Sequence, residues 1–422
     1  MKTHCQTRFF YGHVLVLAGF FIMLLIYGTL YSFGVFLKPL LAEPGWTRPS
    51  VLGAYSLCFF LSGALATAAG WLTDRLGPRF VISCSGILIG SGYLLVSCAT
   101  TVTDLYLYYG LLVGAGMSGG IAPILSTITR WFSAKRGLMA GFVVAGVGTG
   151  TLVVPPIATA LIFAFGWRAS CRIFGITLLV FLAGLAQLFL SDPSRKGLTP
   201  FGSQQTPAGP DDPQLEGLSL RHAFRTRQLW ILIALYICAG FFIQIALVNT
   251  TIYAISIGAP EFWASALVSL MGFGSVAGRV GGGFASDRLG LKPVVVAACL
   301  MMAVQFGGLL VSDNLWVLFI FAAFFGITYG EILCAMPLLP AELFGMRHHG
   351  ALLGLITFAS TLGGGLGPVV AGHIVDSGGG YAMVWMACMA AGLAASGLSI
   401  SLKTGNEPSQ RPGSWPDVSR ET

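Results

Sequence analysis

Long apolar runs recur along this chain, and charged residues, prolines or glycines separate each run from the next. A helix needs roughly 20 mainly apolar residues to cross a bilayer, and the runs have about this length. Membrane β-strands would be shorter and would alternate in polarity, so the pattern predicts an all-α membrane protein. The twelve predicted spans are 13–36, 51–72, 80–99, 104–127, 138–163, 169–190, 229–254, 263–284, 293–311, 315–338, 350–373 and 381–402.

The longest interval between two runs divides the chain into halves. Residues 191–228 are rich in Pro, Gly, Ser and Gln, which is typical of a flexible linker. We therefore expect a six-helix bundle at 1–190, a cytoplasmic linker, a second bundle at 229–402 and a cytoplasmic tail at 403–422. The end of the linker, LSLRHAFRTRQLW, predicts a short amphipathic helix on the membrane surface. Pro155 and Pro156 predict a kink or break in the fifth span.

Basic residues are distributed unevenly between the two ends of these spans. Cytoplasmic loops of membrane proteins carry an excess of Lys and Arg. If the N-terminus is inside, few of the 23 basic residues fall outside: Lys38, Arg48, Arg168 and Arg172. The distribution predicts a multi-pass protein of the cell membrane, inner or plasma, with both termini in the cytoplasm.

Composition excludes several other classes of protein. Only 9% of the residues are charged, 55% are hydrophobic and the mean hydropathy is +0.81, so a soluble surface could not be covered. The net charge is +7, but the basic residues lie in short clusters between apolar runs, so we expect no nucleic-acid partner. Glycine-rich stretches lack the GxxxxGK[ST] phosphate loop, so we expect no ATP. Cysteines lack metal-type spacing, and we expect no metal, cofactor or catalytic residue.

A ten-residue motif occurs once in each half. GWLTDRLGPR follows the second span and GFASDRLGLK follows the eighth, about half a chain apart. Matched copies at equivalent places indicate duplication of a six-helix unit. A carboxylate beside basic groups can hold neighbouring helix ends through charge-assisted hydrogen bonds. We therefore predict gating or structural roles for Asp74, Arg75, Arg79, Asp287 and Arg288.

The repeated GxLxDRxGxR motif, the twelve spans and the central linker resemble the major facilitator superfamily over nearly the whole chain. YSFGVFLKPLLAEPGWTRPSV, RWFSAKRGLMAG, GRVGGGFASDRLG and ELFGMRHHGALLG resemble the branch of monocarboxylate transporters and oxalate:formate exchangers. The resemblance implies two six-helix bundles around a central cavity, with access that alternates between the two sides of the membrane. It also implies transport of small organic anions, by proton coupling or anion exchange.

Arg279 lies in the eighth span, about 12 Å along the helix from Asp287. An arginine at that depth is costly unless it faces water, an acid or a ligand. Its planar guanidinium can bind a carboxylate with two hydrogen bonds, so we predict a substrate-binding role. The resemblance supports this role, because family members carry a carboxylate-binding arginine at the matching place. A structural ion pair and a side chain that extends to the inner surface are the alternatives.

Two positions depart from the patterns of the family. Animal monocarboxylate transporters carry an acid one turn before this arginine, where this chain has Ser275. The oxalate exchanger carries a lysine in span eleven, and the comparable stretch here has Ser360. Two carboxylates would require two cations. With Arg279 alone in the cavity region, we favour a monocarboxylate over a dicarboxylate.

Two ionisable residues are candidates for proton coupling. Glu331 is deep within the tenth span, where burial favours the protonated carboxyl group, so it could carry a proton. An ion pair with Arg279 and a position near the inner surface are the alternatives. Lys38 ends the first span. The resemblance implies that it admits anions or carries a proton, and an interfacial lysine is the alternative.

Three further residues complete the predicted substrate site. The resemblance favours a substrate-facing tyrosine in span ten, Tyr329, with helix packing as the alternative. Two helical steps separate it from Glu331, so the two side chains point to nearly opposite sides. Asn249 is expected to line the outer pathway, whereas Gln244 is expected to pack against a neighbouring helix. Tyr31, one turn from Tyr27, is included as a cavity residue, with core packing as its alternative.

These features predict a secondary active transporter of small monocarboxylates, such as lactate- or pyruvate-like anions, and not an enzyme. Its partners would be the organic anion, protons and the bilayer. An anion exchanger of the oxalate:formate type is the alternative within transport. A transporter-like ligand sensor is the alternative of another class, and such sensors usually add a soluble signalling domain, for which 403–422 is too short.

Overall fold

The computed structural model describes residues 10–202, 220–311 and 314–403, and most of these residues are helical. The N-terminal half contains α1 (Gly12–Tyr31), α2 (Phe33–Leu41), α3 (Arg48–Ala64), α4 (Ala66–Leu76), α5 (Pro78–Val96), α6 (Val102–Leu105), η1 (Tyr106–Val113), α7 (Gly114–Met117), α8 (Ile121–Trp131) and α9 (Arg136–Ala186). The short η2 (Pro193–Lys196) follows. The C-terminal half contains α10 (Leu220–Arg225), α11 (Arg227–Ser256), α12 (Glu261–Leu289), α13 (Leu291–Leu309), α14 (Leu315–Ala335), α15 (Leu338–Phe344), α16 (His349–Asp376) and α17 (Gly380–Ile400).

The helices agree with the predicted spans. Among the described residues, nine helices are long and apolar enough to cross a membrane, and the bent pair α3–α4 makes ten. The 51-residue α9 covers the fifth and sixth predicted spans, and the 29-residue α12 covers the eighth. These segments account for all twelve spans. The short α10 lies within the stretch for which an amphipathic helix was predicted, although part of that stretch is outside the described residues.

Of the predicted kink or break at Pro155 and Pro156, the break is wrong, because α9 continues through both prolines. The non-helical residue inside α9 is Gly166, with φ 79° and ψ 164°. Glycine adopts a positive φ readily because it has no Cβ, whereas other residues are strained there. Gly166 therefore provides the turn between the fifth and sixth spans.

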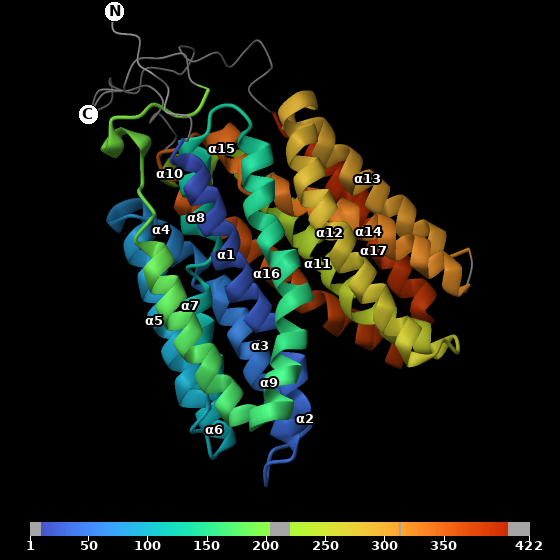
Figure 1. Ribbon diagram of the computed structural model, residues 1–422. Coiled ribbons are helices and arrows are strands. Elements are labelled where there is room, and N and C mark those ends of the chain that lie inside the picture. The colour runs from blue at the N-terminus through green and yellow to red at the C-terminus, as the bar shows by residue number, and fades with distance from the viewer. Residues whose placement is uncertain (1–9, 203–219, 312–313, 404–422) are drawn as a thin grey trace, which may run out of the picture.

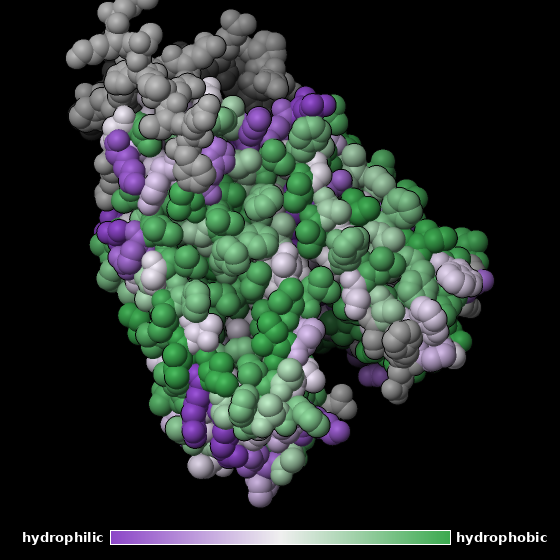
Figure 2. All heavy atoms as spheres, in the orientation of Figure 1, coloured by the Kyte–Doolittle hydropathy of each residue, from purple (hydrophilic) through white to green (hydrophobic). Residues whose placement is uncertain are grey.

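The outer surface is largely apolar between its two ends, where hydrophilic residues gather (Figure 2). Large hydrophobic side chains are widely exposed, including Phe163 at 95% and Val304 at 67%. Soluble monomers rarely expose apolar patches of this extent. The surface is therefore suited to lipid, and the helices satisfy their own backbone hydrogen bonds within the bilayer.

The two halves lie side by side and are closer at the end that carries α4, α8 and α15 than at the end that carries α2 and α6 (Figure 1). Both DRxG loops, at 74–77 and 287–290, belong to the closer end, here called the DRxG end. Their glycines have matching backbone angles, with φ 89° and ψ 160° at Gly77 and φ 88° and ψ 156° at Gly290. The motif thus repeats as a structural turn as well as a sequence.

Candidate functional site

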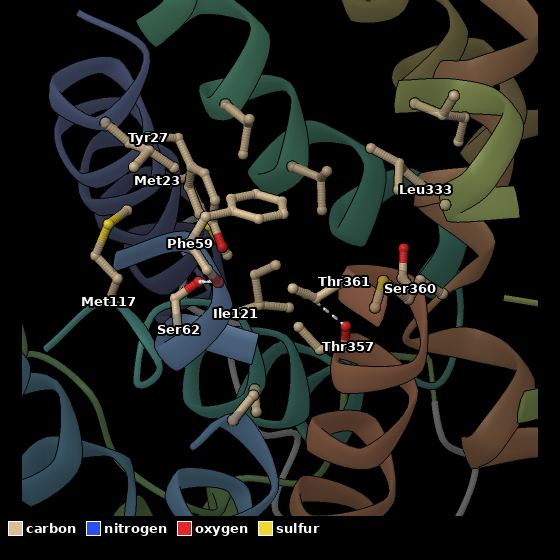
Figure 3. Close-up of a pocket in the computed structure, with 18 of the residues that line it drawn as sticks. Met23, Tyr27, Phe59, Ser62, Met117, Ile121, Leu333, Thr357, Ser360 and Thr361 are labelled. Atoms are coloured by element: carbon tan, nitrogen blue, oxygen red, sulfur yellow. Dashed lines mark hydrogen bonds between the residues drawn. The ribbon is translucent and has the colours of Figure 1, made fainter. Parts of the chain in front are cut away.

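A cavity of about 140 Å³ lies between the two halves. The N-terminal half lines it with α1, α3, α4, α7, α8 and α9, and the C-terminal half lines it with α11, α12, α14 and α16. Side chains from both halves point toward one another across it (Figure 3). The space-filling view shows a notch between the halves at the end away from the DRxG loops (Figure 2).

The two walls of the cavity differ in polarity. The N-terminal half contributes mainly apolar side chains: Met23, Phe59, Met117, Ile121, Val144 and Val147. Tyr27 and Tyr31 of α1 add two phenol groups to this wall. The C-terminal half contributes most of the polar groups: Gln244, Arg279, Tyr329, Thr357, Ser360 and Thr361. An amphipathic solute would therefore be oriented, with its polar group toward the C-terminal half.

Several hydroxyl groups in the cavity donate to their own helices. Ser62 Oγ donates to the Phe59 carbonyl oxygen over 2.7 Å, and Thr361 Oγ1 donates to the Thr357 carbonyl oxygen over 2.9 Å (Figure 3). Thr357 Oγ1 donates to the Leu353 carbonyl oxygen over 2.8 Å. Such back-bonding is usual for Ser and Thr in helices and leaves an oxygen that can accept. The hydroxyl protons of these three residues are thus already engaged, which makes Arg279 more important as a donor.

Arg279 of α12 is fully buried at the cavity, with 0% of its surface exposed. Its Nη2 donates a 2.8 Å hydrogen bond to the Tyr329 hydroxyl oxygen, and its Cζ lies 5.3 Å from the Tyr329 ring centroid. Nε and Nη1 are buried without a hydrogen-bond partner among the described residues. The two salt bridges found in that part of the chain do not involve Arg279. The predicted alternatives of an ion pair and of a side chain extending to the surface do not describe this structure.

A buried guanidinium without a counter-ion is costly in a medium of low dielectric constant. Arg279 is the one residue with a formal charge among the described residues that line the cavity. Gly148 of α9 lies so close to its Nη1 that a Cβ at position 148 would approach within 2.7 Å. The N-terminal half therefore confines the cation without supplying a negative charge, and an anion in the cavity would complete the arrangement.

The structure brings some of the other predicted site residues to the cavity and leaves others elsewhere. Tyr31 and Tyr329 line it. Asn249 is buried, does not line it, and donates through Nδ2 to the Ile245 carbonyl oxygen of its own helix over 3.2 Å. Lys38 is exposed on α2 and also lies outside the cavity. The predicted roles of Asn249 in the outer pathway and of Lys38 in admitting anions or carrying a proton stay predictions.

Glu331 also lies outside the cavity lining, on the same helix as Tyr329. Its Cβ and Cγ pack against Gly282 of α12, where they leave no room for a larger residue. The predicted opposition of the two side chains holds, because Tyr329 faces the cavity and Glu331 does not. No ion pair between Glu331 and Arg279 is present in the described part of the chain.

Gln244, Phe59 and Ser360 are cavity residues to which the sequence assigned no binding role. Gln244 was expected to pack against a helix, but its position five residues before Asn249 places it on a different face of α11. No feature of the sequence indicated that Phe59 faces the cavity, because apolar side chains are equally suitable for lipid, helix contacts and a cavity. Ser360 was noted only as a departure from the exchanger pattern.

Asp74 connects the two halves at the DRxG end. Its Oδ1 accepts from Arg130 Nη2 over 3.0 Å and from the Gly350 backbone N–H over 3.2 Å, and its Oδ2 accepts from the Ala351 N–H over 3.1 Å. Gly350 and Ala351 belong to the first turn of α16, whose N-terminal N–H groups have no partner within the helix. Arg130 Nη2 also reaches the Met346 carbonyl oxygen of the C-terminal half over 3.4 Å.

Asp287 makes the corresponding contact from the other half. Its Oδ1 accepts from the Gly137 N–H over 2.8 Å and its Oδ2 accepts from the Leu138 N–H over 2.9 Å, at the first turn of α9. Each DRxG carboxylate therefore binds the N-terminus of a helix in the opposite half. The predicted hydrogen bonds are present, with backbone N–H groups of the helix ends donating to these carboxylates.

The three arginines of the motifs interact within their own halves. Arg75 lies over the Trp71 ring at 4.2 Å and Arg288 lies over the Phe284 ring at 4.2 Å. Arg79 donates to the Gln187 carbonyl oxygen. Arg130, for which the sequence suggested no role, is the basic residue that pairs with a motif carboxylate.

Two helical bundles around a central cavity, joined at one end by a duplicated motif, are the architecture of a membrane transporter. The chain belongs to the Major Facilitator Superfamily, whose family model matches residues 19–304 and 256–420. Within it, the chain is similar to monocarboxylate transporters. Monocarboxylate transporter 13 of Rattus norvegicus is 30% identical over 400 residues, which cover 93% of this chain and 89% of the relative.

Other relatives and solved structures agree with this assignment. Monocarboxylate transporter 7 of Homo sapiens is 22% identical over 449 residues, covering 93% of this chain and 86% of the relative. The proton:xylose symporter XylE shares the fold, with a TM-score of 0.72 at 15% identity over 94% of this chain and 96% of that structure. FucP in its outward conformation has a TM-score of 0.71 at 14% identity, over 93% and 99%. These proteins are transporters and not enzymes, and the chain is a multi-pass membrane protein.

Proposed function

We propose that this protein is a secondary active transporter that moves a small monocarboxylate across the cell membrane by alternating access. The observation that carries the proposal is the buried Arg279, which lines the cavity with two guanidinium donors unpartnered among the described residues. A carboxylate matches the planar fork of arginine and would supply both the missing hydrogen bonds and the missing charge. The similarity to proteins named monocarboxylate transporters supports the same class of solute.

The walls of the cavity favour one carboxylate over two. A second carboxylate would lie against the apolar side chains of the N-terminal half or among neutral polar groups, without a second cation in the described lining. The desolvation of an unpaired carboxylate is unfavourable by several kcal/mol. An acid with its carboxylate at Arg279 and its apolar body toward Met23, Phe59 and Ile121 fits both walls, as a lactate- or pyruvate-like anion does.

The DRxG end is assigned to the cytoplasm, with both termini on that side, because the predicted inner loops carry most of the basic residues. The structure then corresponds to the state that is closed to the cytoplasm. Asp74 and Asp287 would act as a gate that holds the halves together here and releases them when the cavity opens inward. The contacts of Asp74 and Asp287 at the DRxG end form the proposed gate.

Protons are proposed as the coupling ions. Glu331 remains the candidate carrier, because it lies two residues from Tyr329 and packs on Gly282, three residues beyond Arg279 along α12. Lys38 remains a candidate for admitting anions at the opposite end, where it is exposed. These roles rest on residue type and position.

Anion exchange is the second candidate function, and one observation favours it. Reorientation of an empty transporter would enclose Arg279 in the cavity without a counter-ion in the described lining. A buried unpaired charge raises the free energy of that step, whereas a bound anion neutralises it. Such a transporter would move between its two states mainly when loaded, which is the behaviour of an exchanger.

Purified protein in liposomes can separate these functions. Labelled monocarboxylates and dicarboxylates would be screened for uptake with and without an inside-alkaline pH gradient. Gradient-driven accumulation of a monocarboxylate is expected for proton symport. Uptake that ignores the gradient and requires an internal anion would assign exchange instead. Ligand-induced thermal stabilisation without uptake of any carboxylate would contradict transport and indicate a sensor.

A further inference from the structure

His349 is the first residue of α16 and is completely buried. Its Nε2 lies 2.7 Å from the Pro337 carbonyl oxygen. A carbonyl oxygen only accepts, so Nε2 carries a proton and donates it. Nδ1 is buried without a hydrogen-bond partner among the described residues. This geometry suits a neutral imidazole, with its proton on Nε2 and a lone pair on Nδ1.

The gate is built directly around this ring. The two residues that follow His349, Gly350 and Ala351, donate their backbone N–H groups to Asp74. Arg130 joins Asp74 and also contacts the carbonyl oxygen of Met346. A change at His349 would therefore act on the turn of backbone that Asp74 binds.

A second proton on His349 would meet an unfavourable surrounding. Its complete burial disfavours a cation most, and Arg130 of α8 and Arg136 of α9 repel a cation as well. The positive end of the α16 dipole lies at the same place. The nearby acids would not compensate this charge. Asp74 of α4 already accepts from Arg130 and two backbone N–H groups, and Glu342 of α15 interacts with Arg136. The new N–H at Nδ1 would have no acceptor in the described structure and would cost free energy for that reason too.

The other half of the molecule holds a different residue at the equivalent place. Arg136 precedes Gly137 and Leu138, the two residues that donate to Asp287. Its side chain is partly exposed, its Nε donates to the Phe132 carbonyl oxygen over 2.8 Å, and Asp287 and Glu342 act on its charge. At the Asp287 contact, this position therefore holds a permanent cation, Arg136, which is partly exposed and lies near two acids. At the Asp74 contact, the same position holds the fully buried imidazole of His349, on which Arg130 and Arg136 act.

We propose that His349 is a proton-sensitive latch, and that the gate closes only around its neutral form. When the gate opens, the ring reaches water and can bind a proton, and it must lose that proton before the gate closes again. The open state therefore binds one proton more than the closed state. Acid on the gate side favours opening, by about tenfold for each pH unit below about 6.5, where an exposed imidazole titrates. The latch acts whichever anion is carried.

Distances across the gate test the proposal directly. Spin labels would replace Leu76, which is 56% exposed, and Arg347, which is exposed, in full-length protein whose native cysteines are substituted. Double electron–electron resonance would be recorded in nanodiscs between about pH 5 and about pH 8, which brackets the imidazole range. The open population of the wild type is expected to rise about tenfold per pH unit on the acid side. His349→Gln keeps an N–H donor for the Pro337 carbonyl oxygen but cannot bind a proton in this pH range. The distances between the spin labels in this variant should therefore not depend on pH.

Two further variants complete the test. His349→Arg, which copies the residue of the other half, should favour the open gate at every pH. His348→Gln is the matched control, because His348 is half-buried and acts on Asp74 instead, and it should keep the acid response. An acid response that survives in His349→Gln would overturn the proposal, as would its absence from the wild type. If His349→Gln does not fold, His349→Arg decides, because a permanent cation does not titrate in this pH range, and an acid response that survives in His349→Arg would overturn the proposal.

Discussion

The guanidinium of Arg279 and the hydroxyl of Tyr329 are joined by a 2.8 Å hydrogen bond between neighbouring helices α12 and α14. Tyr329 supplies a neutral oxygen to a cation that has no charged partner in the described part of the protein. The hydroxyl orients the guanidinium and leaves Nε and Nη1 for a ligand. Tyr329 is therefore expected to position Arg279 for carboxylate binding, with its ring stacked on Phe325 at 6.0 Å.

Tyr329→Phe removes this hydroxyl and keeps the stacked ring. A hydrogen bond to a charged group contributes about 1.5 kcal/mol or more, so the KM for the transported acid should rise about tenfold. The measurement is the concentration dependence of initial uptake in proteoliposomes. Tyr109→Phe is the matched control, because Tyr109 packs on Phe33 and Tyr93 outside the cavity. Equal KM values for Tyr329→Phe and the wild type would contradict the positioning role.

Asp74→Asn and Asp287→Asn should each favour the open gate. An amide can replace one of the two acceptor oxygens but not both, and the charge is lost. At about 1.5–3 kcal/mol for a charged hydrogen bond, the closed-to-open ratio should fall roughly 10- to 100-fold. The larger effect is expected for Asp74, which also loses its salt bridge to Arg130.

The accessibility of the native Cys334 thiol can report whether the gate opens in Asp74→Asn and Asp287→Asn. It is buried, and its Sγ lies 3.6 Å from the Gly137 carbonyl oxygen of the opposite half. Labelling of this thiol by a membrane-impermeant maleimide, at constant pH and from the gate side, should become faster in both variants. Asp376→Asn, at the other end of α16, should label like the wild type. Unchanged labelling in Asp74→Asn and Asp287→Asn would show that these contacts do not hold the halves together.

The apolar wall should favour acids with a longer apolar body. Each buried methylene contributes about 0.8 kcal/mol, so butyrate should compete about fourfold better than propionate. Succinate, with a second carboxylate, should compete poorly. Phe59→Ser should reduce the gain from the added methylene, whereas Phe60→Ser, at a side chain that is 50% exposed, should not. Equal inhibition by propionate, butyrate and succinate would contradict the proposed orientation of the substrate.

Glu43 ties α9 to the loop before α3, at the end away from the gate. Its Oε1 accepts from Arg168 Nη1 over 2.6 Å and from Trp167 Nε1 over 3.1 Å, and its Oε2 accepts from Arg168 Nη2 over 3.2 Å. The hydrogen bond from Arg168 is the main cause that lowers the pKa of Glu43. Because its pKa is lower in the folded protein, its stabilisation is present above about pH 4.3, the ordinary value, and is lost as the pH falls through the folded value.

Glu43→Gln should therefore lower the free energy of unfolding at neutral pH, by less than about 1 kcal/mol for a partly exposed pair. The difference from the wild type should vanish in acid, below the pKa of the folded protein. Thermal unfolding in detergent across this pH range measures the effect. An equal difference at neutral and acid pH would show that the charge of Glu43 is not its source.

Most of the fold could be predicted because each membrane span carries its own signal. A helix that satisfies its backbone in lipid must be long and apolar, so the spans are visible as runs. The paired DRxG motifs indicated the repeat, and the cost of a buried cation indicated Arg279. What could not be predicted is which way each side chain faces. Asn249 and Gln244 are equally plausible in the sequence, because α11 is apolar toward lipid and toward its neighbours alike.

The contacts between the two halves could not be predicted from the sequence either. Asp74 binds Ala351 and Asp287 binds Leu138, pairs that are far apart along the chain. The motif indicated that the carboxylates hold helix ends, but not which ends. Residues at 203–219, within the predicted linker, and the predicted tail beyond 403 lie outside the described residues.

The central claim is that Arg279 binds the carboxylate of the transported solute. Its most direct test is the initial rate of monocarboxylate uptake into proteoliposomes by the wild type, Arg279→Ala, Arg279→Lys and the exposed control Arg225→Ala, at equal amounts of folded protein. Loss of a buried charged partner contributes about 2–5 kcal/mol, so kcat/KM should fall at least about 30-fold in Arg279→Ala. Arg279→Lys should recover only part of the loss, because lysine lacks the planar fork. Uptake by Arg279→Ala at the rate of the wild type would contradict the account.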